Sequence, residues 1–367
     1  MEYNQHSNCR KVKTVLKRSY ILIGLACLLL GCTRGQAVTE MEPTEVPVMQ
    51  TQAAPEQSTP EPKTVELTVD VSLVPTAEPL STPEPTLEPT PEPTSTPVPK
   101  LGVLDGKFAD KFVEGTPVLT ENSYQSDRVA IFISRVVDDS KTLTNHTFNY
   151  FVADVYFQNM EDLRSAPAKS WDKIWTNDWL VDVAKKENAI FAVSGDFTLS
   201  RKVGLVIRNG EQLQAEHDEK RDVAVIYTDG RMETYLASEV PVEQILGDET
   251  VWQILGFGPE LLDANGQPKT VFNDPNQVGH DNIRNAVGYY EPGHYCFVYV
   301  PYYKTRDRYT CIDMEGLSQL MHQLGCTRAY NLDGGATAGM FFNGKLVSDK
   351  GLGQSRQIHD FYYIPKM

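Results

Sequence analysis

The sequence Asn-Leu-Asp-Gly-Gly at 331–335 stands between a predicted helix and a predicted hairpin. A short run typical of a strand, Thr327–Leu332, leads into Asp333, and two glycines follow it directly. Glycine permits positive φ and brings backbone N–H groups close to a ligand. A carboxylate beside such groups can stabilise a developing cation, and the N–H groups can hold phosphate oxygens. The same residues also fit a plain tight turn with Asp as the turn residue, so the neighbouring sequence must decide.

Two helices are predicted in the globular part of the chain. Asp313 can cap a helix that Gly325 ends. The apolar face of this helix repeats near 3.6 residues and comprises Met314, Leu317, Leu320, Met321 and Leu324. A second helix is expected over Ser170–Lys186, where Trp171, Trp175 and Trp179 recur every four residues. This tryptophan stripe is interpreted as core, with a sugar-binding platform as the alternative.

Strand and hairpin signals dominate the rest of the globular part. Val129–Val137 and Tyr150–Phe157 are rich in the β-branched and aromatic residues that strands prefer. Four pairs fit tight hairpin turns: Asn209-Gly210, Asp229-Gly230, Asn265-Gly266 and Asn343-Gly344. Because strands and helices do not alternate regularly, we expect an α+β fold, a single mixed-sheet domain with several β-hairpins and few helices.

The N-terminus has the features of a lipoprotein signal peptide over residues 1–31. A basic region precedes the apolar run Ile21–Leu30, which is shorter than the about 20 residues of a membrane-spanning helix. Leu29-Leu30-Gly31-Cys32 looks like a bacterial lipobox, in which cleavage precedes Cys32 and its thiol is lipidated. An uncleaved signal anchor is the alternative. In both cases the rest of the chain is exported and held at the membrane, on the outer face or the cell surface.

Residues 32–100 comprise the lipidated Cys32 and a stretch dominated by Pro, Thr and Glu, which has too few apolar residues to bury a core. We expect a disordered, semi-rigid stalk behind a globular domain over 101–367. The formal net charge of −15 and the absence of a basic patch argue against a nucleic-acid partner.

Three cysteines remain after the signal and Cys32, namely Cys296, Cys311 and Cys326, so at most one disulfide can form. Cys326 is interpreted as a small buried hydrophobic residue, and a Cys296–Cys311 bridge stays open. No paired-cysteine motif or metalloprotease helix suggests a metal site, and we expect no organic cofactor. A divalent metal is possible, but no ligand cluster in the sequence supports one.

The stretch Gly325–Thr337, followed by Asn343–Val347, resembles the C-terminal signature of phosphodiester glycosidases. These are bacterial relatives of the enzyme that uncovers mannose 6-phosphate by removing N-acetylglucosamine. Further segments are similar to the family's motifs in the same order: Tyr150–Arg164, Ala192–Phe197, Gly204–Gly210, Gly256–Leu261, Arg284–Gly288 and Ser355-Arg356. The chain departs from the family at Ser194, where Asn is usual, at Asn285 and at Ala336-Thr337.

The resemblance implies a substrate with a sugar joined through its anomeric carbon to a phosphodiester. Breaking that bond passes through an oxocarbenium-like state, and the leaving phosphate needs charge neutralisation. Arginine binds phosphate bidentately, so Arg284 and Arg356 are the candidates, with structural ion pairs as the alternative. A carboxylate must face the sugar carbon or activate water, for which Asp333 is the first choice and Asp196 the second.

The other candidate substrate-binding residues are Asn331, which could orient the sugar or Asp333, and Gly195, Gly334, Gly335 and Thr337. The expected activity is cleavage of a sugar-1-phosphodiester in a glycan or sugar-phosphate polymer of the cell surface. A non-catalytic glycan-binding lipoprotein with the same fold is the alternative function. For the enzyme, we expect Asp333, Arg284 and Arg356 to converge on one pocket.

Replacing Cys32 with Ser should release the protein from membranes or block its processing, because the thiol that carries the lipid is removed. Membrane fractionation and mass spectrometry of the mature N-terminus measure both effects. A mature protein that begins at Met1 would mean that a different kind of anchor is used.

Overall fold

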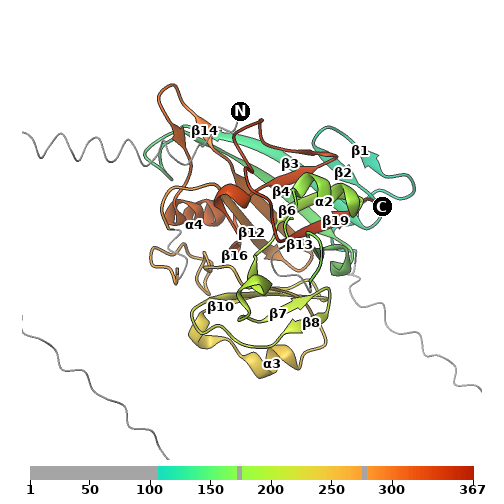
Figure 1. Cartoon of the computed structure of the whole chain (residues 1–367). Helices are drawn as coiled ribbons and strands as arrows, with labels where there is room; N and C mark the ends of the chain where they lie inside the picture. Colours follow the sequence, from blue (N-terminus) through green and yellow to red (C-terminus); the bar gives the residue numbers. More distant parts are fainter. Residues whose placement is uncertain (1–105, 172–175, 275–278) are drawn as a thin grey trace, which may run out of the picture. The chain divides into compact units, whose positions relative to one another are not determined.

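The computed structural model of the chain describes residues 106–171, 176–274 and 279–367. The signal peptide, Cys32 and the stalk lie outside these residues, and the described ones belong to one compact unit. Within the described ranges, no helix has the length and apolar character needed to cross a membrane. Figure 1 shows a strand-rich unit with a few short helices on its outside.

The largest sheet has seven strands, and every neighbouring pair in it is antiparallel. In spatial order the strands are β1 (Val118–Leu119), β2 (Ser123–Gln125), β3 (Val129–Asp138), β4 (Phe148–Phe157), β13 (His294–Val300), β12 (Arg284–Glu291) and β16 (Arg328–Asn331). The sheet therefore ends at the strand that leads into Asp333.

Two five-stranded antiparallel sheets complete the unit. One has the order β18 (Lys345–Leu346), β17 (Met340–Phe342), β6 (Ala189–Ser194), β19 (Asp360–Pro365) and β5 (Arg164–Pro167). The other has the order β10 (Met232–Tyr235), β9 (Val223–Tyr227), β11 (Val251–Leu255), β7 (Val206–Arg208) and β8 (Glu211–Gln214). A separate hairpin joins β14 (Tyr303–Lys304) to β15 (Tyr309–Thr310).

The main core lies between the seven-stranded sheet and the two smaller sheets. It joins Phe297 of β13 to Phe191 of β6 and Ile226 of β9, and all three side chains are buried. Alternation along each strand sends the other side chains to the outer faces, where helices cover them. The helices are α2 (Leu180–Lys186) on the β6 sheet, α3 (Val242–Leu246) on the β9 sheet and α4 (Met314–Gln323) on the seven-stranded sheet (Figure 1).

The expected α+β class is confirmed, with antiparallel sheets, several hairpins and few helices. The strands divide into three main sheets, which the sequence pattern did not indicate. Asn209-Gly210, Asp229-Gly230 and Asn343-Gly344 do join paired strands, and Asn265-Gly266 turns between bridged residues Leu262 and Pro268.

The predicted helix before the signature is also confirmed. Asp313 Oδ1 accepts a hydrogen bond from Gly316 N at 2.8 Å, and Gly325 ends the helix region with φ +85°. The helix expected over Ser170–Lys186 is wrong in its extent, because α2 begins at Leu180. Trp179 is 42% exposed, so it is not a core residue, and Trp175 lies outside the described residues.

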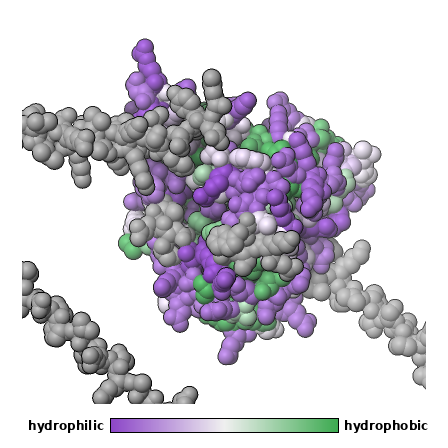
Figure 2. All heavy atoms as spheres, viewed as in Figure 1, coloured by the Kyte–Doolittle hydropathy of each residue, from purple (hydrophilic) through white to green (hydrophobic). Residues whose placement is uncertain are grey.

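The visible surface is mostly hydrophilic, with apolar side chains in small separate groups (Figure 2). Among the described residues, the exposed large apolar side chains are Val118, Leu119, Val137, Trp179, Val271 and Tyr309. Val118 and Leu119 are neighbours on β1, and the others come from separate strands and turns, as is ordinary for a folded domain.

Candidate functional site

Two turns that follow strands of different sheets meet beside Asp333. Strand β6 ends at Ser194 and continues into Gly195-Asp196, while β16 ends at Asn331 and continues into Leu332-Asp333. Asp333 N donates a hydrogen bond to Gly195 O at 3.1 Å, which joins the two turns directly. The site is therefore built where the seven-stranded sheet and the β6 sheet come together.

Asp333 is partly exposed, and its carboxylate has a defined environment. Thr337 Oγ1 donates to Asp333 Oδ2 at 2.8 Å from the short 3₁₀ turn Gly335–Thr337. Burial raises the pKa of Asp333 to about 6, although the Thr337 hydroxyl, the charges of Arg356 and Arg201, and the Gly334 backbone favour the ionised form. A carboxyl group with this pKa changes its charge near neutral pH, as an acid–base group requires.

The two glycines after Asp333 are required by the backbone around them. A Cβ on Gly334 would lie 2.8 Å from Ile283 O, which is closer than a carbon can approach. Gly335 has φ +66°, and its N–H donates to Ile283 O at 2.8 Å. The Gly335 N–H, expected to bind the substrate, is thus already used to fix the turn against the start of β12.

Arg201 was not recognised from the sequence, yet its charge acts on Asp333. Its guanidinium donates to Gly256 O at 3.0 Å and to Asp196 O at 3.4 Å. It lies 5.4 Å from the ring centroids of both Phe197 and Phe257. A short turn bounded by the left-handed residues Phe197 and Lys202 carries it, and no periodic sequence signal marks such a turn.

Arg356 comes from the chain segment before β19. Its backbone N–H donates to Ala336 O at 2.9 Å, so the segment is fixed beside the signature turn. Its side chain is exposed, and within the described residues its guanidinium forms no hydrogen bond or salt bridge. The charge of Arg356 favours ionised Asp333, which agrees with the expectation that the two share a site.

A third guanidinium, that of Arg221, lies near Arg201. It donates to Asp218 Oδ2 at 2.9 Å and to Phe257 O at 3.3 Å. Burial and the neighbouring charge of Arg221 lower the pKa of Arg201, and the negative charges of Asp196 and Asp333 partly oppose this shift. The charges of Arg201 and Arg356 thus act on Asp333, and Arg221 acts on Arg201.

Arg284 is positioned differently from the expectation. Its side chain is 1% exposed and donates to the carbonyl oxygens of Ile312 and His280. Burial lowers its pKa to about 10, and the nearby charges that oppose this shift include Asp281 and Asp313. Because side chains alternate along β12, the Arg284 side chain lies on the α4 side of the sheet, while its neighbour Asn285 donates to Gly339 O. The backbone at the start of β12 supports the Asp333 turn, since Ile283 O accepts from Gly335 N and Asn285 O accepts from Leu332 N.

Asp196, the second catalytic candidate, is fully buried and its two oxygens are occupied. Oδ1 accepts from Arg208 Nη2 at 2.6 Å, and Oδ2 accepts from Gly256 N at 2.8 Å and from Tyr362 OH at 3.3 Å. Asp360 Oδ2 lies 3.6 Å from the same Arg208 nitrogen. These contacts give Asp196 a supporting position behind the turn.

Asp360 explains why residue 195 is glycine. Asp360 Oδ1 accepts hydrogen bonds from Asp196 N and Phe197 N, each at 3.1 Å. A Cβ on Gly195 would lie 2.2 Å from this same oxygen. The two carboxyl groups share one buried cation, since Arg208 Nη2 lies 2.6 Å from Asp196 and 3.6 Å from Asp360. Burial and the charge of Asp196 raise the pKa of Asp360 above its ordinary value.

Asn331 and Ser194 connect the site to adjacent loops. Asn331 Nδ2 donates to Gly258 O at 2.8 Å, which holds the loop that contacts Arg201 and Arg221. Ser194 Oγ donates to Thr337 O at 2.6 Å, so the residue that replaces the family's usual Asn fixes the 3₁₀ turn beside Asp333. Both side chains are buried.

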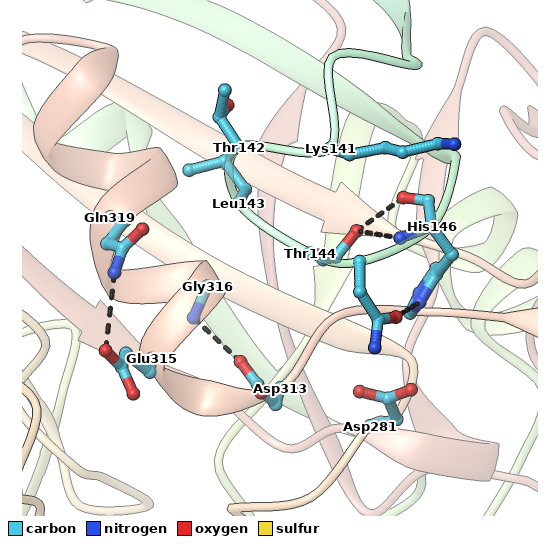
Figure 3. A pocket seen from close by; sticks show the side chains of 11 residues that line it. Lys141, Thr142, Leu143, Thr144, His146, Asp281, Asp313, Glu315, Gly316 and Gln319 are labelled. Atoms are coloured by element: carbon cyan, nitrogen blue, oxygen red, sulfur yellow. Dashed lines mark hydrogen bonds between the residues drawn. The ribbon is translucent and has the colours of Figure 1, made fainter.

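A separate open cavity of about 370 Å³ lies between the β3–β4 loop and the start of α4. Figure 3 shows its polar lining, which includes Lys141, His146, Asp281, Asp313 and Glu315. None of its lining residues belongs to the segment Asn331–Gly335, so we place the candidate active site at Asp333 instead. Within the described ranges, no group of three or more His, Cys, Asp or Glu side chains is arranged to hold a metal ion.

The residues around Asp333 all lie in a region that matches a known family. A family model described as phosphodiester glycosidase matches residues 187–364. This segment is therefore similar to the phosphodiester glycosidases. The resemblance carried by Asn331–Gly335 is confirmed, and the family indicates a glycosidase-type function.

The fold is also similar to solved structures. The catalytic domain of zebrafish N-acetylglucosamine-1-phosphodiester alpha-N-acetylglucosaminidase, auto-inhibited by a pro-peptide, matches with a TM-score of 0.50 and 18% identity over 65% of this chain and 83% of that chain. A hypothetical protein from Synechocystis matches with a TM-score of 0.46 and 13% identity over 65% of this chain and 62% of that chain. No curated protein matches the chain. The likeness to the zebrafish enzyme shows a shared fold.

Replacing Asp196 with Asn should lower the free energy of unfolding by roughly 1–3 kcal/mol, because buried Arg208 loses its charge partner at 2.6 Å but keeps Asp360 at 3.6 Å. Denaturant unfolding of the whole protein measures this loss. An Asp196→Asn protein with unchanged stability but greatly reduced turnover would contradict the supporting role and favour a catalytic one.

Proposed function

We propose that this protein is an exported, membrane-anchored glycosidase that cleaves the bond between a sugar and phosphate in a sugar-1-phosphodiester. The substrate belongs to a glycan or a sugar-phosphate polymer of the cell surface. The observation that carries this proposal is Asp333, a partly exposed carboxyl group with a pKa of about 6 that lies within the electrostatic reach of Arg201 and Arg356. The family assignment of the surrounding segment supports the same chemistry.

The arginines account for the phosphate half of the substrate. Cleavage between the anomeric carbon and oxygen leaves the bonding electron pair on a phosphomonoester, which gains negative charge. Guanidinium groups neutralise such charge and bind two phosphate oxygens at once. Arg356 is exposed and available for this contact, while Arg201 is held by Gly256 O and Asp196 O at the edge of the site.

Asp333 accounts for the sugar half. Loss of the phosphate leaves an oxocarbenium-like sugar, and an ionised carboxylate can stabilise this cation or accept a proton from the attacking water. The Thr337 hydroxyl holds Oδ2 at 2.8 Å and so fixes the orientation of the carboxylate. At neutral pH Asp333 is mostly ionised, since its pKa is about 6 in the presence of the Arg356 and Arg201 charges.

Replacing Asp333 with Asn should reduce turnover by about a hundredfold or more, because size is retained and the charge is lost. The wild-type kcat/KM should rise as pH increases through about 6 and then level off, since the ionised form is active. Release of free sugar and phosphomonoester from a panel of sugar-1-phosphodiesters measures both effects.

Stability provides the control for this variant. Burial raises the folded pKa of Asp333 above its ordinary value of 3.8, so its contribution to stability is present below about pH 4 and lost as pH rises through about 6. The Asn variant should therefore be no less stable than wild type above pH 6. Normal turnover by a folded Asp333→Asn protein would overturn the catalytic role. Glycan binding without any sugar release by wild type would favour the non-catalytic alternative.

Replacing Arg356 with Gln should raise KM for phosphodiester substrates roughly tenfold to a hundredfold, because a charge-assisted phosphate contact is lost. Arg306 is a matched control, since it is exposed on the β14–β15 hairpin and forms no salt bridge within the described residues. Arg306→Gln should leave KM unchanged. Equal effects of the two substitutions would mean that only the overall charge of the protein matters.

A further inference from the structure

Two buried cysteines that are distant in sequence meet on the α4 side of the large sheet. Cys296 lies in β13, and Cys326 lies in the turn between α4 and β16, 30 positions later. Their sulfur atoms are 3.6 Å apart, and the side chains are 0% and 4% exposed. Both belong to the same apolar cluster as Met321 of α4.

A glycine between them makes this contact possible. Strand β12 separates β13 from β16, and Gly288 of β12 pairs with Cys296 on one side and with Ala329 on the other. A Cβ at Gly288 would lie 2.5 Å from Cys326 Sγ and 2.7 Å from Cys296 Sγ. Any side chain at 288 would occupy the space in which the two sulfurs meet. Glycine at this position therefore allows the two thiols to be in contact above β12.

The third cysteine of the folded unit has a different environment. Cys311 belongs to a different apolar cluster from Cys296 and Cys326, the main core between the sheets. Its carbonyl oxygen accepts a hydrogen bond from His146 Nε2 at 2.7 Å. The pairing Cys296–Cys311, which the sequence left open, is therefore less favoured than Cys296–Cys326.

We propose that Cys296 and Cys326 form a disulfide in the exported protein. This inference rests on the expected export of the chain and not on its glycosidase activity. Disulfides form and persist outside the cytoplasm, where the thiols meet oxidants. The bond needs the sulfurs to approach from 3.6 Å to about 2.05 Å, and Cys326 lies in the turn that precedes β16.

The chemistry is an exchange with an external disulfide, either small or carried by a thiol oxidoreductase. The Cys326 thiolate attacks one sulfur of that disulfide and releases the other as a thiolate. The Cys296 thiolate then attacks the Cys326 sulfur of the mixed disulfide and releases the second thiolate. The protein loses two electrons and two protons in total, and the external disulfide is reduced to two thiols.

Exchange should take place before the domain closes. The hydrogen bond with Cys296 and burial raise the pKa of Cys326 well above its ordinary value, so the folded thiol is a poor source of thiolate. Once formed, the bond would connect β13 to the segment that leads into β16 and Asp333. It would hold the start of the signature strand in register with the centre of the sheet.

Peptide mapping of the whole exported protein tests the proposal directly. Trypsin leaves Cys311 and Cys326 in one peptide, Tyr309–Arg328, and a second protease that cuts after Glu315 separates them. After free thiols are blocked under denaturing conditions, we expect a linked pair that contains Cys296 and Cys326. Its mass should equal the sum of the two peptides less two hydrogen atoms. Blocked, unlinked Cys296 and Cys326, or a link through Cys311, would overturn the proposal.

Thermal unfolding gives a second measurement with a matched control. A reductant should lower the Tm of wild type and of Cys311→Ser by roughly 5–15 °C, as expected for a bridge that closes a loop of this size. The double variant Cys296→Ser and Cys326→Ser should show no response to reductant. An equal reductant response in this double variant would also contradict the proposed bond.

Discussion

The buried ion pair between Arg208 and Asp196 is the constraint on which the site depends. Neither group has access to water, so each needs the other within hydrogen-bonding distance. The pair positions Asp196, whose second oxygen accepts from Gly256 N, and it also attracts Asp360. Asp360 in turn holds the backbone after Gly195, and Gly195 O receives the Asp333 N–H. One cation in the interior thus determines where the Asp333 carboxylate lies.

The groups around Asp333 divide into a fixed set and an exposed set. Arg201 is partly buried against two aromatic rings, and carbonyl oxygens define its orientation. Arg356 is exposed, and only its backbone is fixed beside the signature turn. Such a division suits a substrate whose phosphate must enter and leave, since a rigid cation can set the position and an exposed one can follow the ligand.

The sequence predicted those features that depend on neighbouring residues. The cap at Asp313, the Asx-Gly hairpins and the turn after Asn331 are all local, and all are present. Arg201 escaped prediction because its place depends on two left-handed residues and on carbonyl groups remote in sequence. The direction of the Arg284 side chain depends on strand register, since a shift of one residue would turn it to the other face. The helix and core predicted for the Trp-rich segment were wrong, because the spacing of residues alone does not show which of them a neighbouring element covers.

Ser194 has a consequence for divergence within the family. Its hydroxyl holds Thr337 O, and the Thr337 hydroxyl contacts Asp333, so residue 194 is connected to the carboxylate without reaching the substrate. A different side chain at 194 would change the strength of the Thr337 contact and thereby the acidity of Asp333. A variant with another side chain there, on the same framework, would then work best at a different pH. Adaptation to the acidity of a habitat could proceed through this one interior position while the substrate contacts stay unchanged.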